Sequence, residues 1–493
     1  MSFPFEELLS SDDGLTVISS QDAGFMEALT SRTFVSNFPS DTQADLLPEA
    51  VIVAITTVAV QKAVQFCHKY KLQISPRTGG HNWHSIFLQG KNTVILDVGG
   101  LDSVQFEDET KTILAGPGAT SVNTKIPKEY FFPSGHCPSV PLGGFVLGGG
   151  YGIGFPKYGM ACSSVIGMEV VLASGEIRWV QETDDDDIAK ALMDLVKGSY
   201  HRFPAVVTKY QLRAFQSPKC VLQQSFLFAP TDWKLALRYG RDMMHRSTID
   251  TSSIETAVVF CHCPPDLVEL IGAKTMVVLS LVVWSDEDEI PTRQFLEEQT
   301  KHFEGMAISP ATAKPVNAHT LARDVYGPLY PNARYITDGY FGDESYLGSS
   351  DETYFNLIQP LADSWISDDG LLPGPHSHTL FVLCNKSLRQ VNGCDLACGF
   401  VPSFEVMSYA IFEDDTIDGK VSVDLKKGLE GLRQSSNTWT VLPEGNIRTG
   451  KAAFRGWHDI SAKLKILDPD EVFKKSEKKN SFPGNQTHFV RIV

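Results

Sequence analysis

Residues 134–152 read Ser134-Gly135-His136-Cys137-Pro138-Ser139-Val140-Pro141-Leu142-Gly143-Gly144-Phe145-Val146-Leu147-Gly148-Gly149-Gly150-Tyr151-Gly152, with seven glycines within 18 residues. Glycine inside a helix or strand costs about 0.5–1 kcal/mol relative to alanine, so the run predicts neither element. We expect a tightly folded loop whose backbone N–H groups approach something bulky and negatively charged. Its reactive side chain is Cys137, flanked by Pro138 and Pro141. A loop that also bonds covalently to its ligand could use this thiol.

A second informative segment lies upstream and reads Ser75-Pro76-Arg77-Thr78-Gly79-Gly80-His81-Asn82-Trp83. It follows a predicted strand–helix–strand unit, an arrangement in which a nucleotide is gripped at the end of a strand. No Gly-x-Gly-x-x-Gly motif opens the helix, so the unit is not a Rossmann fingerprint.

Together, the Arg77–His81 segment and the run beginning Gly135-His136-Cys137-Pro138 resemble the berberine bridge enzyme-like flavoprotein oxidases. These oxidases belong to the vanillyl-alcohol oxidase superfamily, whose FAD-binding domain is called PCMH-type. The resemblance covers about residues 45–215 well and a piece near 454–474 loosely. It implies FAD bound bicovalently, with His81 bonded to the 8α-methyl group and Cys137 to C6 of the flavin.

The resemblance also implies a wider set of cofactor contacts, the glycines through backbone amides to the pyrophosphate and ribityl groups. The set is Arg77, Thr78, Gly79, Gly80, His81, Asn82, Cys137, Val140, Gly143, Gly144, Gly148, Gly149, Gly150, Gly152 and Val207. The alternatives are a histidine hydrogen-bonded within its turn, a cysteine acting as a small buried hydrophobe, and glycines that only form turns.

The sequence departs from the family pattern at three places. Pro141 stands where the family usually has glycine, which removes one N–H. The loop 199–205 has lost the family's glycines and asparagine and carries His201 and Arg202 instead; we expect Arg202 to face solvent. Leu442 aligns loosely with the tyrosine that often serves as the family's catalytic base.

The usual base is therefore in doubt, and other residues are candidates. The main candidates are Glu405, Tyr335, Tyr340 and Glu444, with Tyr354, His376 and His378 as further ones.

Length and composition set limits on the function. The chain has 493 residues, enough for two or three domains, and a net charge of −16, which argues against nucleic-acid binding. No membrane-spanning run or signal peptide is visible, so we expect an intracellular, cytoplasmic protein without a membrane partner. Nine scattered cysteines do not indicate a disulfide framework. The Cys261-His262-Cys263 triplet and the Cys394-x-x-x-Cys398 pair lack further ligands at a recognised zinc-site spacing.

Hydrophobic patterning predicts the secondary structure. In the first half we expect a helix from an N-cap at Thr57 to Tyr70, a hairpin joined by Ser174-Gly175, and an acidic helix start at Asp184–Asp187. The expected strands there are 50–54, 72–75, 94–98, 112–116 and 205–212, and residues 1–45 are expected to form a surface-packed extension. In the second half, helices are expected at 233–244 and 292–303 and strands at 275–284 and 378–384.

These observations and the resemblance predict an α+β, two-domain PCMH-type FAD-binding fold with an inserted antiparallel-sheet substrate domain. We expect an FAD-binding domain at 1–215, a substrate-binding domain at 216–445 and a return segment at 446–493. The implied activity is oxidation of a bulky natural-product or sugar-like substrate by hydride transfer to flavin N5, with O₂ reduced to H₂O₂. The alternatives are a dehydrogenase of the same fold, or a cyclase or non-redox scaffold.

Overall fold

A computed structural model of the protein describes most of the chain. The described residues are 3–8, 14–32, 46–243, 254–310, 312–322, 333–346, 348–367, 371–384, 397, 402–440 and 457–473. Leu442, Glu444, Cys394 and Cys398 lie outside them.

The first sheet has four strands in the order β1-β2-β4-β3. They are β1 (Leu15–Ser19), β2 (Ala50–Ala54), β4 (Thr93–Asp97) and β3 (Gln73–Arg77); β1 is antiparallel to β2, whereas β2, β4 and β3 are parallel. The expectation of a mere surface extension for residues 1–45 is therefore wrong for its described part. Apolar side chains in β1 and in α1 (Phe25–Thr30) pack against this sheet.

Helix α2 (Thr57–Tyr70) connects β2 to β3 and buries the predicted face of Val60, Val64 and Cys67. Its N-cap is Thr56 rather than the predicted Thr57, because the Thr56 side chain accepts the Ala59 N–H at 3.1 Å. Two adjacent threonines made the sequence ambiguous by one residue.

The second sheet is antiparallel, in the order β5-β6-β10-β8-β9. Its strands are β5 (Val104–Glu107), β6 (Thr112–Ala115), β10 (Ala205–Arg213), β8 (Val165–Leu172) and β9 (Ile177–Gln181). The predicted hairpin is confirmed by the β8–β9 pairing. Asp186 caps α5 (Asp187–Leu195) by accepting the N–H groups of Ile188 and Ala189, which confirms the acidic helix start. Strand β5, which pairs with β6, was missed in the sequence.

The sequence predicted that the glycine run forms a loop throughout, and this prediction is wrong for part of the run. It contains α3 (Leu142–Leu147) and leads into α4 (Phe155–Tyr158). Position 143 in α3 requires glycine, because a side chain there would collide with Thr78, whose Cγ2 lies 2.7 Å from the ideal Cβ position. Close packing between α3 and the segment that contains Thr78, rather than helix propensity, therefore explains the glycine at position 143.

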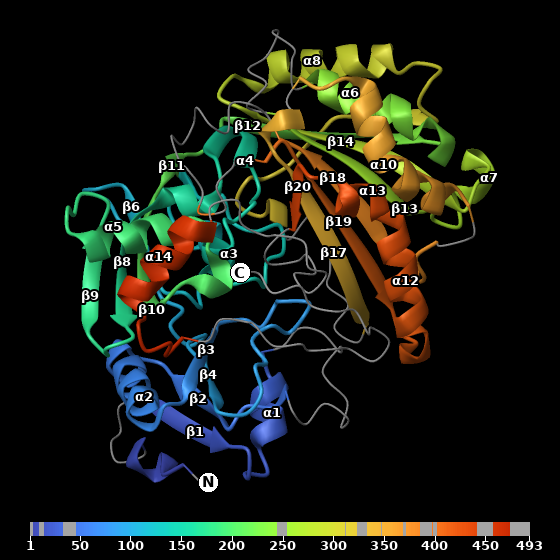
Figure 1. Ribbon diagram of the computed structural model, residues 1–493. Coiled ribbons are helices and arrows are strands. Elements are labelled where there is room, and N and C mark those ends of the chain that lie inside the picture. The colour runs from blue at the N-terminus through green and yellow to red at the C-terminus, as the bar shows by residue number, and fades with distance from the viewer. Residues whose placement is uncertain are drawn as a thin grey trace.

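The largest sheet has nine antiparallel strands, and helices cover its outer face (Figure 1). In spatial order the strands are β15 (Ser309–Pro310), β12 (Cys220–Phe228), β14 (Thr275–Ser285), β13 (Ile254–His262), β18 (His378–Leu383), β19 (Phe404–Phe412), β17 (Arg334–Gly342) and β20 (Thr438–Thr440), with β16 (Lys314–Pro315) also paired to β12. The covering helices are α6 (Trp233–Met243), α8 (Glu289–His302), α10 (Asp351–Ile366), α12 (Asp418–Gly428) and α13 (Glu430–Gln434). Their buried apolar side chains form one core with the sheet.

The chain returns to its first half near the C-terminus. Helix α14 (Trp457–Leu467) lies beside α5 and buries Ile460 and Leu464 in the core of the second sheet (Figure 1). Beyond it, the Ile74 N–H donates to the Val472 carbonyl at 2.7 Å. The fold is α+β with two domains, as predicted. Within the described segments, no helix has the length and apolarity needed to cross a membrane.

Candidate cofactor and substrate site

A cavity of about 720 Å³ lies between the glycine segments of the first half and the uncovered face of the nine-stranded sheet. Its walls come from the segment after β3, the glycine run, the loop before β10, and strands β13, β14, β17, β18 and β19. A cavity of this size, walled mainly by apolar groups with a few polar ones, is typical of a small-molecule site.

The two glycine segments recognised in the sequence pack directly against each other. An ideal Cβ at Gly79 would lie 2.5 Å from Cγ and Cδ of Pro141, closer than real contacts allow. Gly143 approaches Thr78 in the same way, and its N–H donates to the Pro117 carbonyl at 2.7 Å. That N–H is therefore engaged within the protein. The two segments therefore lie against each other, and Pro141 contributes to the contact.

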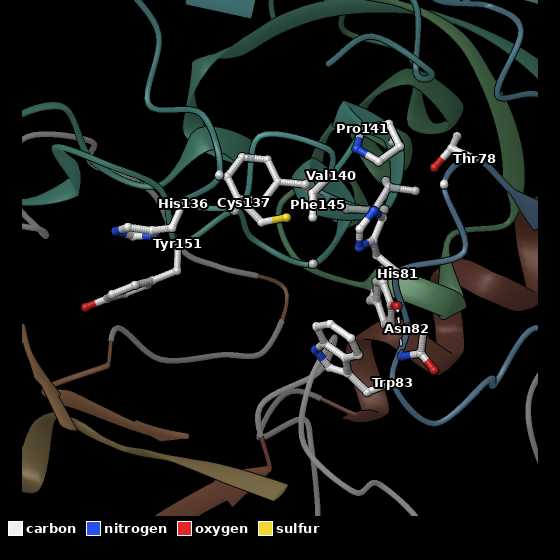
Figure 2. A pocket seen from close by; sticks show the side chains of 18 of the residues that line it. Thr78, His81, Asn82, Trp83, His136, Cys137, Val140, Pro141, Phe145 and Tyr151 are labelled. Atoms are coloured by element: carbon white, nitrogen blue, oxygen red, sulfur yellow. Dashed lines mark hydrogen bonds between the residues drawn. The ribbon is translucent and has the colours of Figure 1, made fainter. Parts of the chain in front are cut away.

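His81 lies at the contact between these segments and lines the cavity (Figure 2). Burial lowers the pKa of its imidazole from 6.5 to about 4, although a hydrogen bond with the Ser139 backbone acts in the opposite direction. The ring is therefore neutral at pH 7, the state in which a ring nitrogen keeps a lone pair for bonding.

Cys137 also lines the cavity, with its sulfur directed toward the side on which the His81 ring lies (Figure 2). Its Sγ is 3.3 Å from the Ser139 hydroxyl. Ser139 thus contacts both residues, through its backbone to His81 and through its side chain to Cys137. The arrangement presents two potential nucleophiles to one space.

Most of the other predicted cofactor residues line the same cavity. These are Arg77, Thr78, Gly79, Gly80, Asn82, Val140, Gly143, Gly144, Gly148, Gly150 and Val207. Gly149 and Gly152 do not line it. Gly149 has φ +101°, and a Cβ at Gly152 would lie 2.2 Å from the Pro133 carbonyl oxygen, so the backbone path requires glycine at both positions.

Two of these lining residues, Arg77 and Asn82, form hydrogen bonds with other protein groups. The Arg77 guanidinium donates to Asp97 through Nε (3.0 Å) and Nη2 (2.6 Å), and to the Leu29 carbonyl at 2.6 Å. Asn82 donates to the Tyr200 hydroxyl at 3.1 Å. Arg77 thereby links β3 to β4 and α1, and Asp97 has a structural role.

The base candidates separate into two groups. Glu405, Tyr335, His376 and His378 line the cavity. Tyr340 and Tyr354 do not: they are buried in the core between the nine-stranded sheet and its helices. The Tyr340 hydroxyl donates to Asp338 at 3.2 Å, and the Tyr354 hydroxyl donates to the Tyr346 carbonyl at 3.1 Å. Strand alternation explains the difference between Tyr335 and Tyr340, because they lie an odd number of positions apart on β17 and therefore face opposite sides of the sheet. Tyr354 lies on α10, on the helix-covered side.

The altered loop before β10 also differs from expectation. Its turn η5 (Tyr200–Arg202) begins with Tyr200 at φ +50°. Arg202 is 6% exposed and does not line the cavity, so the expectation that it faces solvent is wrong. His201 does line the cavity, and burial, followed by the charge of Arg202, holds its pKa well below 6.5.

Sequence reasoning missed several polar cavity residues. The His136 Nε2 lies 2.9 Å from Glu255 Oε1, and the Tyr151 hydroxyl contacts the Cys384 sulfur. His136 and Tyr151 belong to the quoted glycine run, but their partners lie more than 100 residues away, in β13 and directly after β18. Only the tertiary fold brings them together.

Aromatic rings form another part of the wall. Trp83 stacks on Tyr335 at 4.6 Å between ring centroids, and His378 stacks on Tyr409 at 4.9 Å. Trp83 also meets Tyr409 edge-on at 6.4 Å. Trp83 follows His81 by two residues, so the segment that carries this histidine also supplies an aromatic wall.

Comparisons with known proteins agree with the fold and the first-half motifs. The family described as "FAD binding domain" matches residues 48–181. An FAD-linked oxidoreductase of Penicillium janthinellum, janO, is 26% identical over 318 residues, 64% of this chain and 66% of its own. A carbohydrate oxidase of Microdochium nivale is 31% identical over 190 residues, 37% of each chain. Berberine bridge enzyme-like 2 of Arabidopsis thaliana is 31% identical over 152 residues, 30% of this chain and 28% of its own.

Among solved structures, the berberine bridge enzyme of Eschscholzia californica superposes with a TM-score of 0.73 at 13% sequence identity, covering 94% of this chain and 96% of its own. The fold and the FAD-binding domain define a two-domain flavoprotein of the PCMH type. The chain carries an FAD-binding domain, and the relatives it matches are named FAD-linked oxidoreductases and berberine bridge enzyme-like proteins. The matched regions span 66%, 37% and 28% of the three relatives' own lengths.

Proposed function

We propose that this protein is an FAD-dependent oxidase whose flavin is attached at His81 and Cys137. The observation that carries the proposal is the presence of both nucleophiles on one cavity, joined through Ser139. The residues fit such a group: the imidazole is neutral, the thiol is half-buried beside a hydroxyl, and glycine backbone forms much of the adjoining wall. When bound, FAD would supply an acceptor for a substrate hydride and pass the electrons to O₂, giving H₂O₂.

The substrate would lie against the nine-stranded sheet. Glu255 and Glu405 bring carboxylates to the cavity, while its lining contains no lysine among the described residues and only one arginine, Arg77, which is held by Asp97. This charge distribution disfavours an anionic substrate. Stacked aromatic pairs and a volume of about 720 Å³ suit a bulky neutral or positively charged molecule, either a natural-product intermediate or a sugar.

Oxidation of an alcohol or amine also requires a proton acceptor. Glu405, Tyr335, His376 and His378 are the sequence-derived candidates that reach the cavity. Position 442 carries a leucine and no phenol, so a basic group that lines the cavity would remove the substrate proton.

We also propose the division of labour between domains. Residues 1–215 would bind FAD, residues 216–445 would bind substrate, and residues 446–493 would return to the FAD-binding part. The arrangement of the sheets and the contact of α14 with α5 support these boundaries.

The test of the flavin attachment is denaturation. After acid precipitation, flavin absorbance should stay with the wild-type polypeptide and with the single variants His81→Ala and Cys137→Ala. The double variant should release it. Free FAD in the supernatant of denatured wild-type protein would contradict bicovalent attachment.

A further inference from the structure

The His136–Glu255 pair is a polar element that spans the cavity boundary. His136 lies between β7 (Tyr130–Phe131) and α3, and Glu255 lies in β13 of the large sheet. The His136 Nε2 is 2.9 Å from Glu255 Oε1, while Glu255 Oε2 accepts the Gly154 N–H at 3.0 Å. Both carboxylate oxygens are therefore occupied, and the side chain is only 7% exposed.

This geometry fixes the orientation of the imidazole. A carboxylate at Nε2 selects the tautomer that carries its hydrogen on Nε2, which makes Nδ1 the basic nitrogen. The same carboxylate stabilises the imidazolium formed when Nδ1 takes up a proton. The His136 side chain is 30% exposed and lines the cavity, so a bound molecule can reach it.

The position of His136 along the chain is informative because it directly precedes Cys137. In the flavin ring system, C6 and N5 are neighbouring peri positions. A bond between Cys137 and C6 therefore brings N5, where a hydride would arrive, close to the segment that carries His136. This step rests on the proposed attachment of the flavin.

Other titratable groups surround the pair. Tyr151, from the glycine run, interacts electrostatically with Glu255, with Cys384 after β18 and with Glu405 of β19. Cys384 also interacts with Glu405. Burial is the first cause that raises the pKa values of Tyr151 and Cys384 well above their usual range, so both stay protonated at neutral pH. Tyr151 is thus a hydrogen-bond donor there, and it cannot accept the substrate proton.

We propose that His136, oriented by Glu255, is the proton acceptor for the substrate. The substrate C–H bond would break as a hydride that moves to the cofactor, and the O–H or N–H bond would break as a proton that moves to His136 Nδ1. A C=O or C=N bond forms between the two atoms. The imidazolium then returns its proton to solvent after product departure.

The first test needs no substrate. Flavin absorbance of the purified holoenzyme is titrated between pH 5 and 9, because a charge that appears beside the flavin changes its spectrum. Wild type should show a one-proton transition that His136→Gln removes, since glutamine can keep the bond to Glu255 without titrating. The control His262→Gln, on the same strand as Glu255 but bonded to the Leu372 carbonyl, should retain it.

The same titration contains the results that would overturn the proposal. A wild-type spectrum without this transition, or a transition unchanged in His136→Gln, would show that His136 does not titrate beside the flavin. Loss of flavin from denatured wild-type protein would instead contradict the proposed covalent attachment, and it is distinguishable from a failure of the role proposed for His136.

A second test separates proton transfer from a purely structural tie between the domains. In Glu255→Gln the amide can still accept from Gly154 but donates to His136 Nε2, which moves the ring hydrogen to Nδ1 and blocks proton uptake there. With any sugar or polycyclic alcohol that reduces the wild-type flavin anaerobically, His136→Gln and Glu255→Gln should each slow reduction by about 10²–10⁴-fold. Unchanged reduction rates in both variants, with normal thermal melting, would contradict the role.

Discussion

The ring of Pro141 occupies the space into which a side chain on Gly79 would project, 2.5 Å from the ideal Cβ position. The two residues belong to different segments of the candidate flavin site, one after β3 and the other at the N-cap of α3. Pro141 is also the residue at which the sequence departs from the family's glycine. The departure therefore changes how the segments carrying His81 and Cys137 fit together.

This contact predicts that Gly79→Ala is destabilising. The added methyl must displace a rigid ring, so we expect a loss of about 1–3 kcal/mol in the free energy of unfolding and less attached flavin. Gly419→Ala in α12 is the matched control, since nothing lies within 4 Å of its Cβ position. Chemical denaturation and the flavin-to-protein absorbance ratio measure both effects.

A double-mutant cycle makes this prediction specific. In a Pro141→Gly background, Gly79→Ala should cost clearly less, because its partner ring is gone. Equal costs in the two backgrounds would assign the effect to the Gly79 backbone alone.

The second prediction concerns pH and His81. Its pKa is about 4 in the folded protein and near 6.5 when unfolded, so the unfolded chain binds more protons between these values. The corresponding stability is fully present above pH 6.5 and is lost as the pH falls toward 4, by up to about 3 kcal/mol. Flavin-free protein from riboflavin-depleted cells should show this loss in denaturant titrations.

The comparison that isolates His81 is the difference between wild type and His81→Gln. His201 and His378 also have lowered pKa values, so both proteins keep part of the acid sensitivity. The variant should lose less stability than wild type on going from pH 7 to pH 5. Parallel pH profiles would show that the imidazole of His81 is not desolvated.

The sequence predicted the main features of the FAD-binding half because its signals are local. A helix face such as Val60, Val64 and Cys67 repeats with helical periodicity, and the two glycine segments are contiguous. Resemblance to the flavoprotein family supplied the roles proposed for His81 and Cys137. The substrate half was less predictable, because which strand residues face the cavity depends on pairing and register across distant segments. Tyr335 reaches the cavity and Tyr340 does not, although both lie on β17.

That difference gives the third prediction. Tyr340→Phe and Tyr354→Phe should leave the pH dependence of flavin reduction unchanged, because neither hydroxyl reaches the cavity. Each should instead cost about 1 kcal/mol of stability through a lost buried hydrogen bond. Stopped-flow reduction across pH 5–10, together with thermal melts, measures the two quantities. A reduction limb near pH 9–10 that disappears in either variant would return that tyrosine to the list of bases.

The last prediction concerns oxygen and the loop before β10. Reaction of a reduced flavin with O₂ is favoured by positive charge nearby, which stabilises the superoxide formed first. His201 lines the cavity, but burial and the charge of Arg202 hold its pKa well below 6.5, so its ring is uncharged at pH 7. Arg202 carries a charge but is buried away from the cavity lining.

We therefore expect His201→Asn to leave reoxidation of the photoreduced enzyme by O₂ within about twofold of wild type. Arg202→Ala should instead destabilise the fold by roughly 2–4 kcal/mol. Stopped-flow reoxidation and thermal melts test the two variants. If His201→Asn slowed reoxidation tenfold, the ring would have to be charged in the reduced enzyme. If wild type reoxidised no faster than free reduced flavin, the protein would be a dehydrogenase that needs another acceptor.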